Sequence, residues 1–189
     1  MLTIAIIGAG PLGRWLALAA ASGGFRVFLE DVMPASLLHA QEYIRRQLSP
    51  FALAREKSQI AFVTSIEDAV READLVIDCV PDELESKLEI LWLLDRMAPP
   101  RTVFATPTTQ LSIADLAACT YRADRCVAIV ADARELVHGL ASSIRIRTSS
   151  RTSAPTVALV RTFWEQLGVA PVFEAEPESG PETAVRQVP

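Results

Sequence analysis

Histidine, cysteine and clustered basic residues are scarce in this sequence of 189 residues. Two histidines and three cysteines, with no pair at metal-ligand spacing, argue against a zinc site. The odd number of cysteines (Cys79, Cys119 and Cys126) favours reduced thiols in a cytoplasmic protein over a disulfide framework. A net charge of −5 without a basic patch argues against binding to nucleic acid.

The sequence also contains no long apolar run, and we expect no leader sequence at its start. No apolar stretch reaches the roughly 20 residues of a membrane-spanning helix, and the first residues are strand-like, without the charged start of a signal peptide. We therefore expect no membrane contact. Half of the residues are apolar, which is enough for a substantial core, and the length suits one domain, or one domain with a tail.

The strongest motif lies within the first 31 residues. A strand-like run precedes the pattern Gly8-x-Gly10-x-x-Gly13, a helical segment follows it, and a second strand-like run ends at Asp31. A Gly-x-Gly-x-x-Gly pattern alone is a weak signal. Here it follows a strand, opens a helix and has an acid 18 residues past Gly13, and this context predicts a dinucleotide-binding turn.

Each residue of the turn has a physical role in this prediction. Gly8 permits the tight turn, Gly10 lets a pyrophosphate approach the backbone, and Gly13 allows the helix to pack closely on the sheet. Pro11 suits a first helical position, because its missing N–H is not needed there. The helix N-terminus, which includes Leu12, offers free N–H groups and a partial positive charge to the phosphates.

Asp31 sets the predicted cofactor preference. Its carboxylate would accept hydrogen bonds from the adenosine ribose hydroxyls and would repel a 2′-phosphate, and no arginine follows it closely. We therefore predict NAD as the cofactor in preference to NADP. The alternative, an ordinary strand–turn–helix without a ligand, is disfavoured by the spacing of the motif.

The remaining chain alternates strand-like and helix-like segments, which predicts an α/β fold with a doubly wound, mostly parallel Rossmann sheet and helices on both faces. Helices are expected at 33–48, 66–73, 84–97, 112–119 and 155–167, and strands at 60–63, 75–80, 102–105, 125–131, 144–147 and 169–173, with 132–142 ambiguous. We predict a single domain over 1–173 and an acidic, loosely ordered tail over 174–189. Because apolar and charged residues alternate in 144–147, that strand is expected at an edge or half exposed.

The order of elements resembles the N-terminal NAD-binding domain of the 3-hydroxyacyl-CoA dehydrogenases, over about residues 2–173. The matching stretches are 6–13, 27–35, 74–87, 98–100, 111–117 and 151–153 with the helix that follows. The stretch 74–87 is the most specific, because many families share the glycine motif. The resemblance implies an oxidoreductase of fatty acid metabolism that uses NAD and an acyl-CoA.

The same resemblance implies cofactor contacts after the strand 75–80. The family places an acid at the position of Asp82 and a lysine at that of Lys87 beside the nicotinamide half of NAD, and Val80 and Pro81 lead into this stretch. The position of the two residues is expected on other grounds too. A carboxylate at the carboxyl end of a strand, and a lysine one turn into the next helix, should both face the crevice. A solvated surface lysine is the alternative for Lys87.

The catalytic residues of the family do not carry over. Its Asn-Thr-Ser-Ser segment is replaced by Pro-Thr-Thr-Gln, in which Thr109 keeps a hydroxyl at the position of the substrate-binding serine. The general acid/base histidine falls at Val130, the asparagine after it at Ala133, and the carboxylate that orients the histidine near Ile144 or Ser142. Valine cannot take or give the alcohol proton that hydride transfer requires.

Glu135 and His138 offer a shifted substitute for this pair. They are three residues apart, so on a helix they would share a face. A surface pair is the simpler interpretation. The family's C-terminal helical domain has no counterpart here, and the segment at 49–60, which contributes to CoA binding in the family, looks short.

Three functions remain open from the sequence. The first is an NAD(H)-binding protein of the 3-hydroxyacyl-CoA dehydrogenase type without ordinary turnover. The second is an active NAD-dependent oxidoreductase on a small hydroxy or keto substrate, using Thr109, His138 or a partner's residues. The third is a non-catalytic structural or regulatory module. The intact motif disfavours the third and Val130 disfavours ordinary turnover, so we prefer the first.

A homodimer formed by this domain is also expected. The predicted edge strand at 144–147 would leave backbone groups unpaired, and such edges favour association.

Overall fold

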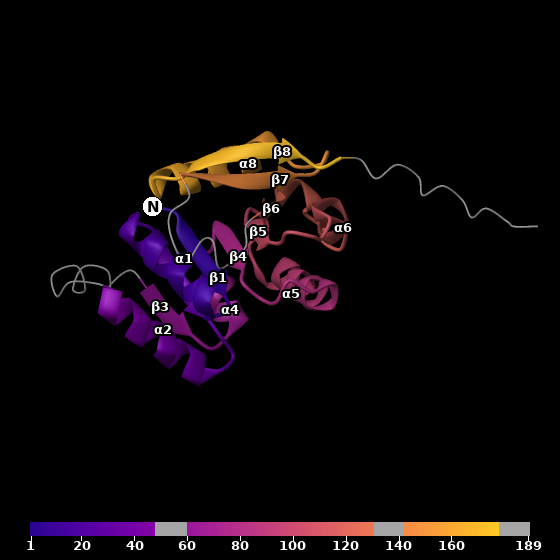
Figure 1. Cartoon of the computed structure of the whole chain (residues 1–189). Helices are drawn as coiled ribbons and strands as arrows, with labels where there is room; N and C mark the ends of the chain where they lie inside the picture. Colours follow the sequence, from indigo (N-terminus) through magenta and orange to yellow (C-terminus); the bar gives the residue numbers. More distant parts are fainter. Residues whose placement is uncertain (48–59, 131–141, 178–189) are drawn as a thin grey trace, which may run out of the picture.

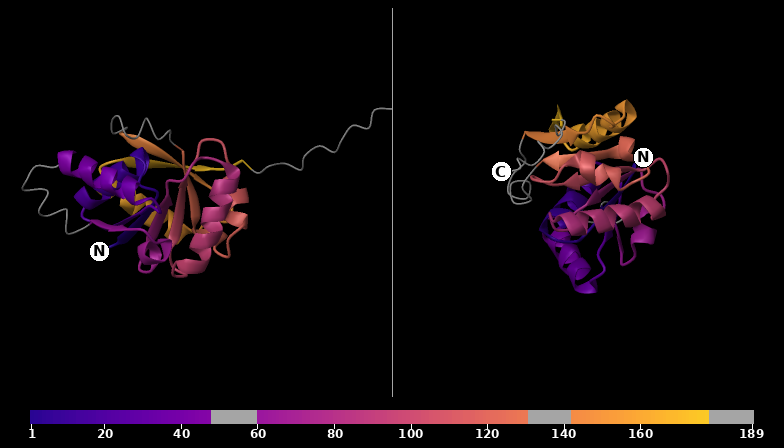
Figure 2. Two further views of the ribbon diagram at one scale, coloured as in Figure 1. Left: turned by 90° about the horizontal axis from the view of Figure 1, so that it is seen from below. Right: turned by 90° about the vertical axis from the view of Figure 1, so that its right-hand side faces the viewer.

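The computed structural model describes residues 1–47, 60–130 and 142–177. It shows an eight-stranded sheet between two layers of helices (Figure 1, Figure 2). The strand order is β3-β2-β1-β4-β5-β6-β7-β8. All neighbours are parallel except β6 and β7. This confirms the doubly wound Rossmann sheet, in which the order reverses beside β1 and opens a crevice at the carboxyl ends of the strands.

The described strands are β1 Thr3–Ile7, β2 Arg26–Glu30, β3 Ile60–Val63, β4 Leu75–Asp78, β5 Val103–Pro107, β6 Cys126–Val130, β7 Ser143–Thr148 and β8 Ala170–Ala175. The described helices are α1 Pro11–Ser22, α2 Pro34–Gln47, α4 Ile66–Val70, α5 Leu84–Met97, α6 Ile113–Ala118 and α8 Ala154–Gln166, with a short 3-10 helix η1 at Ala123–Arg125. Ser65 and Ser112 cap α4 and α6, each accepting a backbone N–H of the first turn.

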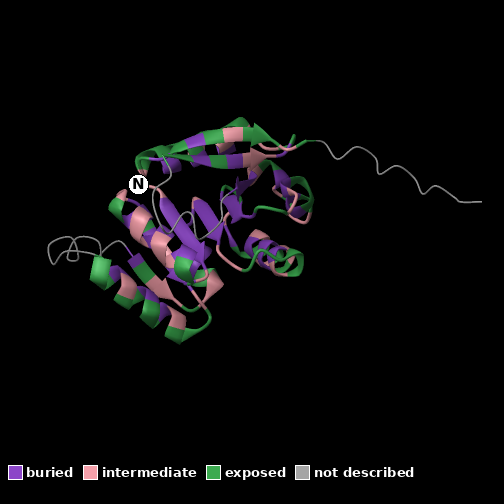
Figure 3. Cartoon of the chain, in the orientation of Figure 1, coloured by how far each residue is buried: buried purple, intermediate pink, exposed green. Residues whose placement is uncertain are grey.

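The core is divided by the sheet into two apolar layers. One face packs against α1, α2 and α8, and the other against α4, α5 and α6. The middle strands β1 and β4 are buried along their whole length, which agrees with their nearly continuous apolar sequences (Figure 3). None of the helices in the described ranges is long and apolar enough to cross a membrane.

The prediction of an edge strand at 144–147 is wrong, because β8 pairs with β7 along its full length. The half-exposed pattern is confirmed: Ile144 and Ile146 are buried in the α8 layer, and Arg145 is exposed. The edges of the sheet are β3 and β8. The ordered chain also passes the predicted boundary at residue 173, because β8 continues to Ala175. The end of the predicted tail, 178–189, lies outside the described residues.

Candidate functional site: a dinucleotide crevice

The turn between β1 and α1 has the geometry that its three glycines predict. Gly8 has φ +98°, a conformation that favours glycine, and its N–H donates to the Glu30 carbonyl at 2.8 Å. A Cβ on Gly13 would lie 1.8 Å from the Gly8 carbonyl oxygen, so only glycine lets α1 pack this closely. A Cβ on Gly10 would meet no protein atom within 4 Å. The space in front of Gly10 is therefore open for a phosphate.

The N-terminus of α1 is free to bind an anion. The helix begins at Pro11, and its first backbone bond runs from the Arg14 N–H to the Gly10 carbonyl at 3.0 Å. The N–H groups of Leu12 and Gly13 precede that bond, Gly10 provides no side-chain cap, and the first turn has no acidic residue. Nothing in this turn competes with a pyrophosphate for the positive end of the helix.

Asp31 is held in place directly beyond β2. Its Oδ2 accepts the Ala9 N–H at 2.9 Å and its Oδ1 accepts the Met33 N–H at 2.8 Å. Each carboxylate oxygen keeps a lone pair that can accept a ribose hydroxyl. Val32 and Met33 follow with 74% and 58% of their surface exposed. These exposed apolar side chains suit the flat face of an adenine ring.

A buried ion pair lies under the centre of the crevice. Lys87 of α5 donates to Asp78, the last residue of β4, with 2.5 Å between Nζ and Oδ1, and the two side chains are 0% and 1% exposed. Lys87 is therefore neither the solvated lysine of the alternative nor a side chain that lines the open crevice. Burial outweighs the ammonium and raises the pKa of Asp78 to about 6. An acid inside a buried apolar strand was the signal for this pair, but the sequence analysis assigned no role to Asp78.

Two buried side-chain oxygens at this ion pair, one of Asp78 and one of Thr106, lack hydrogen bonds. Among the described residues, Asp78 Oδ2 and Thr106 Oγ1 are fully enclosed and have no hydrogen-bond partner. The Thr106 hydroxyl still favours the charged carboxyl, so it lies close by without hydrogen-bond geometry. The buried polar cluster of Asp78, Lys87 and Thr106 is thus incompletely satisfied.

The loops after β4 and β5 meet across the crevice. The backbone N–H of Thr109 donates to Asp82 Oδ2 at 3.1 Å, so two residues predicted for the site are brought together. Val80 is half-buried and Pro81 is exposed on the approach to this contact. Thr108 Oγ1 accepts two N–H groups farther along the loop and fixes its turn.

The far end of the β5–α6 loop is anchored by Glu176. Its carboxylate accepts the Ser112 hydroxyl at 3.0 Å, the Ile113 N–H at 3.1 Å and the Ala114 N–H at 2.8 Å. Arg147 lies 4.0 Å from the same carboxylate. The sequence analysis missed Glu176 because it assigned this residue to the tail, and no local pattern marks a contact between segments so far apart.

The carboxyl end of β6 is apolar where the resemblance places the general acid/base. Val130 is 7% exposed and pairs with Arg145 of β7, and Ile144 is buried. The weak candidates Glu135 and His138 lie outside the described residues. In the described chain, Thr109 is exposed, and its backbone N–H contacts Asp82 in the loop after β4.

Thiol and metal chemistry find no support in the described residues. Cys79, Cys119 and Cys126 are free, and burial raises the pKa of the Cys79 thiol far above its ordinary value. Within 1–47, 60–130 and 142–177, no group of three or more His, Cys, Asp or Glu side chains is placed to hold a metal ion.

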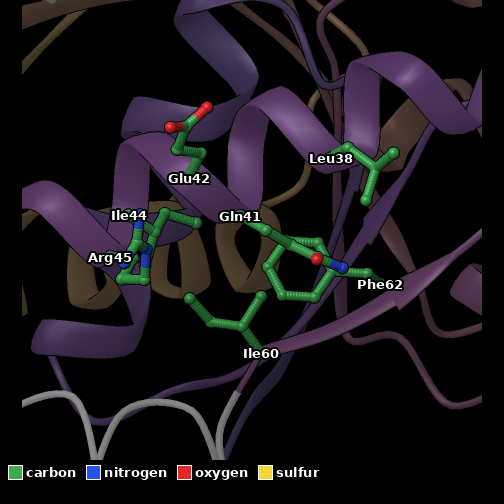
Figure 4. Close-up of a pocket in the computed structure, with 7 residues that line it drawn as sticks. All are labelled: Leu38, Gln41, Glu42, Ile44, Arg45, Ile60 and Phe62. Atoms are coloured by element: carbon green, nitrogen blue, oxygen red, sulfur yellow. The ribbon is translucent and has the colours of Figure 1, made fainter.

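A hollow of about 450 Å³ lies away from the glycine turn, between α2 and β3 (Figure 4). Ile60 and Phe62 of β3 face Gln41 and Ile44 of α2, and Glu42 points away. Its lining is mainly apolar. It therefore adds nothing to the crevice.

Comparison with known proteins agrees with this geometry. The sequence model of the family described as "3-hydroxyacyl-CoA dehydrogenase, NAD binding domain" matches residues 3–176. The chain belongs to this family. NAD is accordingly the cofactor of this dehydrogenase-like domain, and the open turn, the free helix N-terminus and the oriented Asp31 fit it.

Several family members are similar over most of this chain. The probable 3-hydroxybutyryl-CoA dehydrogenase of Bacillus subtilis is 30% identical over 156 residues, which are 74% of this chain and 54% of the relative. The 3-hydroxyadipyl-CoA dehydrogenase of Escherichia coli is 31% identical over 160 residues, 76% of this chain and 34% of the relative. The crystal structure of (S)-3-hydroxybutyryl-CoA dehydrogenase from Ralstonia eutropha superposes with a TM-score of 0.84 at 26% identity, covering 93% of this chain and 64% of that one. The chain thus spans about half the length of its Bacillus relative.

Proposed function

We propose that this chain binds NAD(H) through a 3-hydroxyacyl-CoA dehydrogenase-type domain and does not turn over 3-hydroxyacyl-CoA at an ordinary rate. Val130 carries this proposal. The carboxyl end of β6 presents a buried valine where the family resemblance implies an imidazole, and Ile144 is apolar as well. On the cofactor side, the open glycine turn, the uncapped α1 N-terminus and the oriented Asp31 support the proposal.

The groups of this chain account for cofactor binding but not for proton transfer. Bound NAD supplies a hydride acceptor. The α1 N-terminus would hold the pyrophosphate and Asp31 would orient the ribose, while the Asp82–Thr109 contact joins the loops after β4 and β5. Oxidation of a hydroxyl also requires a group that removes its proton, and loss of such a group costs about 10²- to 10⁴-fold in rate.

A spectrophotometric assay with purified protein, NADH and acetoacetyl-CoA tests the proposal. We expect saturable NADH binding by fluorescence and turnover below about one per second, the low end of the usual enzyme range. Faster turnover that is retained through purification would overturn the proposal. Parallel assays of His138→Ala and Thr109→Val would then show which side chain supports the reaction.

An active oxidoreductase on a small hydroxy or keto substrate is the second candidate. One relative, the 5-formyl-3-hydroxy-2-methylpyridine 4-carboxylate 5-dehydrogenase of Mesorhizobium japonicum, is 29% identical over 89% of this chain, and its name specifies a small ring substrate. Thr109 lies at the rim of the crevice, where it could position such a molecule. A panel of small aldehydes and keto acids with NADH tests this candidate, and a purely structural or regulatory module would bind no cofactor at all.

Assembly and location complete the proposal. A homodimer would use the open edge of β8, where Val172 is 47% exposed, in place of the strand 144–147. Light scattering at high protein concentration tests this, and a monomeric mass would contradict it. The free thiols are consistent with a reducing compartment such as the cytoplasm.

A further inference from the structure

The side chain of Glu30, the last residue of β2, is buried and has no hydrogen-bond partner among the described residues. Its side chain is 4% exposed, and within the described chain no residue donates a hydrogen bond to its carboxylate or pairs with it. The fully enclosed polar atoms without a partner belong to Asp78 and Thr106, so both Glu30 oxygens keep a small contact with solvent. The carboxylate therefore ends just beneath the surface at the mouth of the crevice.

The strand register places this carboxylate. Glu30 is level with Ile7 of β1 and Val63 of β3, and Ile7 is level with Asp78 of β4. Level residues on parallel strands point to the same face. Because Ile7 packs into the α4–α5 layer, Glu30 lies on that face of the sheet. Asp31 instead turns toward the glycine turn through its bond with Ala9, so the two acids reach the end of β2 from different sides.

The surroundings of Glu30 lack a hydrogen-bond donor. Its strand neighbours Ile7 and Val63 are apolar, the α4 acids Glu67 and Asp68 are exposed, and Lys87, which is fully buried, is held by Asp78. Burial first, and the Asp31 charge second, raise the pKa of Glu30 to about 7. A buried carboxyl without a donor is costly, and a ligand that brings a donor would offset that cost.

We propose that Glu30 is a second adenosine-recognition residue, which accepts a hydrogen bond from the 6-amino group of adenine. The donors on the adenosine half of NAD are the ribose hydroxyls and this amino group. Asp31 is placed for the hydroxyls, the exposed Val32 and Met33 offer apolar surface to the ring, and Glu30 is the acceptor that remains. The inference rests on cofactor binding by this domain.

The test compares NAD with nicotinamide hypoxanthine dinucleotide by calorimetric titration at pH 8. This analogue has a carbonyl oxygen in place of the amino group, so it faces an ionised Glu30 with an acceptor. We expect the wild-type protein to bind NAD about tenfold more tightly than the analogue, the value of one hydrogen bond to a charged group. Glu30→Gln should bind both within about twofold, because an amide can donate as well as accept.

Glu67→Gln is the matched control, because it removes the same charge from the exposed face of α4 and should keep the tenfold preference. Thermal melts exclude a folding defect, and Glu30→Gln should melt no lower than wild type, since the amide is not charged. An equal preference in wild type and Glu30→Gln would overturn the inference. If the wild-type protein bound NAD and the hypoxanthine analogue equally, only the inference about Glu30 would be overturned. If it did not bind NAD at all, the proposed function would be overturned as well.

Discussion

The two sides of the crevice differ in what they offer to a ligand. At the carboxyl ends of β1 and β2, the backbone N–H groups of Leu12 and Gly13 at the start of α1 are free, and the Asp31 carboxylate is oriented. At the ends of β5 and β6, the polar groups are already used within the protein. Asp82 and Glu176 accept backbone N–H groups of the β5–α6 loop, and β6 ends in the buried Val130. Cofactor binding and proton transfer depend on different strands, so one can persist while the other is lost.

The largest effect should come from the ion pair that lies under both sides. Lys87→Met removes the partner of Asp78 Oδ1, and Asp78 Oδ2 already lacks one, so the buried carboxylate is left without any partner among the described residues. Loss of one partner of a buried ion pair costs about 3–5 kcal/mol of unfolding free energy. Denaturant unfolding measures it. The double variant Asp78→Asn/Lys87→Met should recover part of the loss, and no difference between the single and double variants would contradict the pairing.

Gly10→Val should separate the two sides cleanly. A Cβ at Gly10 would meet no protein atom within 4 Å, so the valine side chain should occupy the space in front of the turn. The dissociation constant for NAD should then rise at least about 100-fold, with little change in the melting temperature. Thr109→Val on the other side should leave NAD affinity within about twofold. Equal losses in the two variants would show that the sides are not independent.

Stability should fall as pH rises from 5 to 8. The pKa values of Glu30 and Asp78 are raised, to about 7 and about 6, so the folded state holds protons that the unfolded state has already released. The stabilising contribution of each group is complete below its unfolded pKa and is lost as the pH rises through its folded pKa. This loss amounts to on the order of 1–3 kcal/mol of unfolding free energy for each group. Urea midpoints at pH 5 and 8 measure this, and the fall should be smaller in Glu30→Gln.

Asp31→Ala should have the smallest of these effects. Loss of the ribose contacts should weaken NAD binding about tenfold, the value of roughly 1.4 kcal/mol, and should narrow the preference over NADP. Titration of both cofactors measures the ratio. An unchanged ratio would mean that another residue excludes the 2′-phosphate.

Features that depend on neighbours in sequence were predictable. The glycine turn, the start of α1 at Pro11, the helix beginning near Ser112 and the buried strand β4 all follow from local patterns. Contacts between distant segments were not, because no periodicity encodes them. From the sequence, Lys87 was expected either in the crevice or on the surface. The structure shows that it is buried and paired with Asp78 of β4.

The same limit explains the error at β7. Alternation showed that one face of 144–147 is exposed, but alternation is the same for an edge strand and for an inner strand covered on one face. Only the pairing of β8 with β7 distinguishes the two. The site predictions at the cofactor turn depend least on such pairings, because one continuous stretch supplies the main parts of that turn.

The anchoring of α6 by Glu176 also has a consequence for the order of events during synthesis. Ser112 and Glu176 are 64 residues apart, so at about 5–20 residues per second the ribosome adds Glu176 roughly 3–13 seconds after the loop it holds. The nascent chain completes its glycine turn long before that moment, whereas the β5–α6 loop stays without its carboxylate anchor until β8 has joined the sheet. A chain released before residue 176 would keep the glycine turn and lose this anchor.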